Sequence, residues 1–100
     1  MFTNQEEALE QVHIAEALDR LEKDEDFKKI ILEGYCKEYA NGLVTSLAYG
    51  ATEKQLEDRY AKLRAVSIFR AFIAGIHAEG LRAKEALDNP SVFETEETAE

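Results

Sequence analysis

Apolar residues recur at steps of three and four from the start of the chain to about residue 88, the spacing typical of amphipathic helices. The first helix is predicted to begin after Thr3 and to end at about Lys23. Thr3 and Glu6 have the spacing of a capping box, in which the Thr3 hydroxyl accepts from the Glu6 amide. The apolar side of this helix is broad and consists of Leu9, Val12, Ile14, Leu18 and Leu21.

A second helix is predicted from about Glu25 to Tyr49, with Asp24 or Asp26 as its N-cap. At about 100° per residue, its apolar face changes side along its length. One side carries Phe27, Ile30, Ile31 and Tyr35, and the nearly opposite side carries Cys36, Tyr39, Ala40, Leu43, Val44 and Leu47. Either Gly34 breaks the helix, or one continuous helix contacts different partners with its two halves. The continuous helix is favoured, because glycine inside a helix costs only about 1 kcal/mol relative to alanine.

The third helix is predicted after Gly50, which has the character of a left-handed C-cap for the preceding helix. Thr52 and Gln55 form a second capping box, and the helix continues to Asp88, shortly before Pro90. A helix of roughly 35 residues spans about 52 Å. Because a compact three-helix bundle of this size needs less, the excess length is expected to contact a second copy or another protein.

One stripe of the third helix is apolar, and it is the candidate interaction surface. It consists of Val66, Phe69, Ile73, Ile76, Gly80, Ala83 and Leu87, with Phe72 beside it. Arg70 and Arg82 lie outside the stripe, so the central charge needs no buried partner. The segment is too short for a membrane span, which takes about 20 apolar residues. The stripe forms either the core of this chain or a seam between molecules.

The sequence therefore predicts an all-α fold, a helical hairpin of two shorter helices folded against a long third helix. Residues 1–88 are predicted to form one domain. Residues 89–100 are acidic and lack helical periodicity, so a flexible, disordered tail is expected there. Within this tail, Val92 and Phe93 are a candidate docking motif that orders on binding.

The net charge of −9 is unevenly distributed, with −6 on residues 1–33, +2 on 52–87 and −5 on 88–100. Because phosphate contacts need clustered lysine and arginine, direct binding of nucleic acid or of an anionic membrane is disfavoured. Cys36 is the only cysteine, which excludes an intramolecular disulfide. The first residues lack a cationic region followed by an apolar run, so no secretory signal peptide is expected.

Few residues suggest chemistry. Glu10 and His13 have the Glu-x-x-His spacing of di-iron bundles, but the chain holds one such pair and it falls on a polar side, so no metal site is predicted. His77 is expected to be a partly exposed packing residue, and Cys36 an inert buried one. There is no glycine-rich phosphate loop. We therefore expect no catalytic site, no cofactor and no small-molecule substrate.

The segment from residue 15 to 87, above all "DFKKIILEGY", resembles small acidic helical proteins encoded among the head and structural genes of tailed bacteriophages. This resemblance implies a non-enzymatic accessory or adaptor role in virion assembly. It also implies other virion proteins or a second copy as partners, and a location in the virion or in the host cytoplasm during assembly. The alternative is a small acidic inhibitor that occupies a basic nucleic-acid-binding surface of a host protein, an interaction that salt would weaken steeply.

Overall fold

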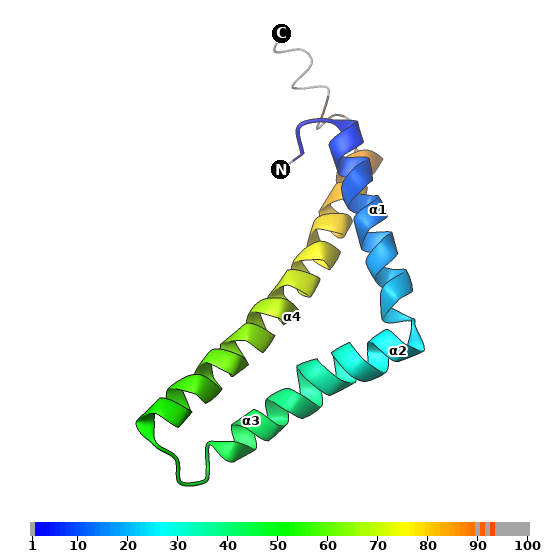
Figure 1. Cartoon of the computed structure of the whole chain (residues 1–100). Helices are drawn as coiled ribbons and strands as arrows, with labels where there is room; N and C mark the ends of the chain where they lie inside the picture. Colours follow the sequence, from blue (N-terminus) through cyan, green and yellow to red (C-terminus); the bar gives the residue numbers. More distant parts are fainter. Residues whose placement is uncertain (1, 90, 92, 94–100) are drawn as a thin grey trace. The chain divides into compact units, whose positions relative to one another are not determined.

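The computed structural model describes residues 2–89, 91 and 93, and the chain is built from helices (Figure 1). The helices are α1 (Gln5–Glu22), α2 (Glu25–Phe27), the π-helix η1 (Lys28–Tyr39), α3 (Ala40–Ser46) and α4 (Glu53–Asp88). Because α2, η1 and α3 follow one another without a break, they form one continuous helical run. No strand occurs among the described residues. The prediction of an all-α, three-helix chain with a long C-terminal helix is confirmed.

The chain divides into two compact units. The first unit consists of Met1–Arg20 and Ala74–Glu100, and the second consists of Leu21–Ile73. The predicted single domain over residues 1–88 stays a prediction. Most of the predicted acidic tail, residues 90, 92 and 94–100, lies outside the described residues.

The N-terminus of α1 is capped one residue later than predicted. The Asn4 side chain, and not the Thr3 hydroxyl, accepts from a helical amide, that of Glu7 at 2.8 Å. The Glu7 carboxylate reaches back and accepts from the Thr3 amide at 3.3 Å and from the Thr3 hydroxyl. The capping box thus uses Asn4 and Glu7, and the predicted pair of Thr3 and Glu6 was wrong. In both pairs, Thr3 with Glu6 and Asn4 with Glu7, a capping side chain precedes a glutamate by three residues, so the spacing alone could not distinguish them.

In the first unit, α1 packs on the C-terminal part of α4 through small residues. Gly80 is buried against Ala15, so closely that a Cβ atom on Gly80 would come within 2.3 Å of the Ala15 Cβ atom. The adjoining core consists of Phe2, Ala8, Ala83 and Phe93, with Val12, Ala86 and Leu87 packed against it. Small residues at the crossing let the two helix backbones approach, and Phe2 and Phe93 are the large side chains of the buried core.

The second unit is a helical hairpin, in which the run from α2 to α3 packs on the N-terminal part of α4. The ring of Phe69 meets the ring of Tyr35 edge to face, with centroids 5.8 Å apart. Cys36 and Val66 are the buried apolar side chains of this unit. Nearer the connection, the Arg59 guanidinium donates to the Ser46 carbonyl oxygen at 2.8 Å. The same carbonyl oxygen also accepts from the Tyr49 amide at 3.2 Å, so Arg59 is its second donor and ties α4 to the end of the helical run.

The π-helix η1 explains the apolar face that changes side in the second helix. A π-helix bonds over five residues, so each residue turns by roughly 20° less than in an α-helix. Over the 12 residues of η1 the lag reaches about 240°, or two thirds of a turn, which is of the same order as the half-turn change of the apolar face. Tyr35 from the first half and Ser46 from the second half both contact α4. The helix is continuous as predicted, and both of its halves contact α4, while contacts of the two halves with different partners stay a prediction.

The connection from α3 to α4 needs no left-handed glycine. Gly50 does not have a positive φ, so its predicted role as a C-cap was wrong. Instead, α3 ends by tightening: Ala48 and Tyr49 donate to the carbonyls three residues earlier, and the Ser46 hydroxyl donates to Leu43. The predicted N-cap of α4 is confirmed, because Thr52 and Gln55 exchange side-chain and backbone hydrogen bonds at 2.9 and 3.2 Å. Asp24 is likewise confirmed as an N-cap and accepts from Phe27.

Candidate functional site

The predicted apolar stripe of α4 makes contacts inside each unit. In the second unit, Val66 is buried and Phe69 packs on Tyr35. In the first unit, Gly80 packs on Ala15, while Ala83 and Leu87 belong to the core around Phe2. Ile73 and Ile76 are half-buried. These placements agree with the interpretation in which the stripe serves the chain's own packing, and a further role of the stripe in binding stays a prediction.

Phe72 differs from the rest of the predicted surface because 64% of it is exposed. Phe93 is buried in the core of the first unit, and Val92, the other half of the predicted docking motif, lies outside the described residues. Of the predicted interaction residues described, Phe72 is therefore the large apolar side chain that is open to a partner.

A second row of apolar positions on α4 was missed by the sequence pattern. We call it the outer stripe, and it consists of Ala61, Ala65, Ile68 and Phe72. Ile68 is 60% exposed, and both alanines are exposed as well. The spacings of four, three and four residues are those of a coiled-coil seam. That spacing was visible in the sequence, but two of the four positions are alanines, so the row was only weakly hydrophobic.

Charged side chains gather in a hollow of about 690 Å³ in the second unit, between Leu43 at the end of the run and the first turns of α4. Lys54, Arg59 and Lys62 outnumber Asp58 there, so this spot is basic in an acidic chain. Asp58 accepts from the Lys62 ammonium at 2.8 Å, and this hydrogen bond raises the pKa of Lys62. Since Arg59 is bound to the Ser46 carbonyl, two of the three cations already have partners within the protein.

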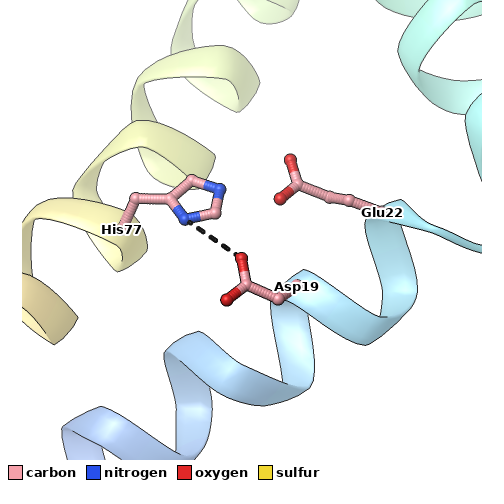
Figure 2. A group of neighbouring side chains, drawn as sticks. All are labelled: Asp19, Glu22 and His77. Atoms are coloured by element: carbon pink, nitrogen blue, oxygen red, sulfur yellow. Dashed lines mark ion pairs between the residues drawn. The ribbon is translucent and has the colours of Figure 1, made fainter.

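The first unit has a smaller hollow, of about 200 Å³, between α1 and α4. Glu16 and Asp19 line it from α1, and His77 and Lys84 line it from α4. Figure 2 shows the Asp19 carboxylate facing the His77 ring, with 3.8 Å between oxygen and Nδ1. The His77 side chain is 41% exposed, as predicted for a packing histidine at the edge of the stripe. A protonated imidazole here would pair with the carboxylate and tie the two helices together.

The other candidate chemical residues are placed without a site around them. Glu10 and His13 are both exposed on α1, and one chain supplies only these two ligands from the Glu-x-x-His pair. Cys36 is buried and forms no disulfide, as expected for an inert thiol. Among the described residues, no helix is both long and apolar enough to cross a membrane.

Comparisons with known proteins found no matching family model, no similar curated protein and no similar solved structure.

Proposed function

We propose that this chain is a non-enzymatic assembly or adaptor protein that acts through helix-mediated contacts with other proteins. The observation that carries this proposal is the balance between buried and exposed apolar side chains. Among the described residues, seven apolar residues are buried whereas eleven large apolar ones are exposed. The exposed ones are Leu9, Ile14, Leu21, Ile30, Tyr39, Val44, Tyr49, Tyr60, Ile68, Phe72 and Leu81.

Single exposed apolar residues are normal on any protein surface. A small chain, however, buries a smaller fraction of its surface on folding, so it can rarely leave many large apolar side chains outside its core. Two of the buried residues are alanines, which remove little apolar surface from water. Apolar surface that a chain leaves open is typical of a protein that completes its packing with a partner. Aromatic residues such as Tyr60 and Phe72 are the types enriched at such interfaces.

The setting we propose is assembly of a tailed-phage virion. The support for it is the resemblance of residues 15–87 to small acidic helical proteins encoded among phage structural genes. An adaptor of this kind binds other virion proteins through apolar helix faces, and its acidic charge orients the encounter.

The experiment is deletion of the gene in the genome that carries it, followed by purification of particles and mass spectrometry of their proteins. We expect incomplete particles without the chain, complete particles when the wild-type gene is restored, and the chain itself in particles or assembly intermediates. Normal particles from the deletion strain would overturn the proposal. Recovery of the chain on a basic host protein, released by moderate salt, would instead support an acidic inhibitor.

A further inference from the structure

We propose that the outer stripe of α4 binds a second copy of this chain, with the two α4 helices antiparallel. This inference rests on the proposed function, because it names one partner for the open apolar surface. All four members of the outer stripe are exposed, and they follow the spacing of a two-helix seam. The order of small and large residues along the outer stripe indicates that the partner is a second copy of this chain.

The outer stripe is complementary in size to itself when it is reversed. Its first half is small, Ala61 and Ala65, and its second half is large, Ile68 and Phe72. A two-fold axis midway between residues 66 and 67 places Ala61 opposite Phe72 of the second copy, and Ala65 opposite Ile68. Each large side chain then meets a small one, as in well-packed cores. Such a contact is isologous and closes on itself, so it forms a dimer and not a filament.

A parallel pair would lack this fit. Phe72 would face Phe72 and Ala61 would face Ala61, which crowds one end of the seam and leaves a gap at the other. The antiparallel order is therefore the one that fills space along the whole stripe.

The charges on α4 favour the same orientation. In the antiparallel register the next seam positions beyond the stripe set Asp58 opposite Gly75 of the second copy, and the positions after those set Lys54 opposite Glu79. A parallel register would set Lys54 against Lys54 and Asp58 against Asp58, and like charges at such positions repel. Lys62 and Arg64 flank the seam, where their aliphatic stems can cover apolar surface while their charges stay in water.

The first test is the mass of the full-length protein in solution, by light scattering and sedimentation equilibrium at several concentrations. We expect a dimer for the wild-type chain, and a rise of more than about tenfold in the dissociation constant for Phe72→Asp, because the change buries a charge twice in a symmetric contact. Tyr60→Asp is the matched control, since Tyr60 is an exposed aromatic residue on α4 outside the outer stripe. Circular dichroism checks that both variants keep their helices.

The second test reads the orientation by disulfide formation, in a Cys36→Ala background. Ala61→Cys and Phe72→Cys lie 11 residues apart, about 16 Å along a helix, which is too far for a disulfide between two identical copies in the antiparallel register. We expect cross-links when the two variants are mixed, and none from either variant alone. Cross-links from each variant alone would overturn the antiparallel order.

A monomeric wild-type chain, or a Phe72→Asp chain as dimeric as the wild type, would overturn the inference. If particle assembly still requires a monomeric chain, the proposed function stands and the outer stripe binds a different assembly protein. If the dimer forms while particles assemble normally without the chain, the inference stands and the proposed function fails.

Discussion

At Gly80, α1 and α4 come too close for any side chain. The Cβ atom of an alanine there would lie 2.3 Å from the Ala15 Cβ atom, well inside van der Waals contact. Alanine has no rotamer that could move the methyl group aside, so the helices would have to separate. The glycine therefore sets the distance between α1 and α4 in the first unit.

Gly80→Ala is expected to destabilise the protein by about 1–3 kcal/mol, the usual cost of overpacking. Gly75→Ala is the matched control on the same helix, because a Cβ atom at Gly75 has no heavy atom within 4 Å. That change should stabilise the protein by up to about 1 kcal/mol through helix propensity. Denaturant midpoints measure both effects, and equal shifts in the same direction would show that the close approach does not constrain the packing.

Glu7 links the start of α1 to pH. The hydrogen bond that the Thr3 hydroxyl donates, together with the one from the Thr3 amide, lowers the pKa of Glu7 from its ordinary value. A lowered pKa in the folded state means that the contact stabilises the fold above the ordinary pKa of a glutamate, and that this contribution is lost as pH falls through the lowered pKa. On acidification, the first turn of α1 should fray before the rest of the helix does.

An NMR titration that follows the Thr3 amide and the Glu7 carboxyl group checks this expectation. In Glu7→Gln the acid-dependent shift of the Thr3 amide should disappear, whereas Glu6→Gln should retain it. A Thr3 amide that responds to acid in the same way in both variants would assign the shift to another group.

Among the elements, the π-helix η1 determines which side chains of the second helix face α4. Gly34 lies within η1, and a Cβ atom on it would come 3.0 Å from the Lys29 carbonyl oxygen. Lys29 precedes Gly34 by five residues, the separation of π-helical hydrogen bonds. A glycine at this position leaves room for the carbonyl of the wider turn.

We expect Gly34→Ala to destabilise the second unit by about 1 kcal/mol or more, because the backbone oxygen must shift or η1 must return to α-helical geometry. Gly42→Ala, in α3 of the same helical run, has no atom within 4 Å of the added Cβ and should stabilise by up to about 1 kcal/mol. Denaturant unfolding gives the signs, and NOEs between residues 29 and 34 report whether the π turn persists. A stabilising Gly34→Ala would contradict this role of the glycine.

The sequence predicted the elements better than their contacts. The change of apolar face after Tyr35 was visible in the pattern, but its cause was not, because an analysis at 100° per residue assumes an α-helix throughout. The first capping box was placed one residue too early because Thr3 and Asn4 are both good N-caps. The second, at Thr52, had no such competitor and was predicted correctly.

For the molecule as a whole, an apolar stripe on a helix looks the same in sequence whether its own chain or another chain covers it. Of the two apolar rows on α4, the row from Val66 to Leu87 has more large hydrophobic residues, and it packs inside the units. The outer stripe has fewer large residues and is left exposed. Which row would be covered depended on close approaches such as that of Gly80 to Ala15, and periodicity carries no information about such pairs.

The connection between α3 and α4 has a practical consequence. Both helix ends close with their own groups, α3 by its tightened last turn and α4 by its Thr52 and Gln55 box, and Arg59 holds the two ends together through Ser46. Gly50 and Ala51, the two residues between these helix ends, therefore take no part in capping. Because each doubling of a flexible loop costs only about 0.6 kcal/mol, a fluorescent reporter or an affinity epitope inserted at Gly50 should leave the hairpin intact. The chain thus offers an internal labelling position away from the outer stripe.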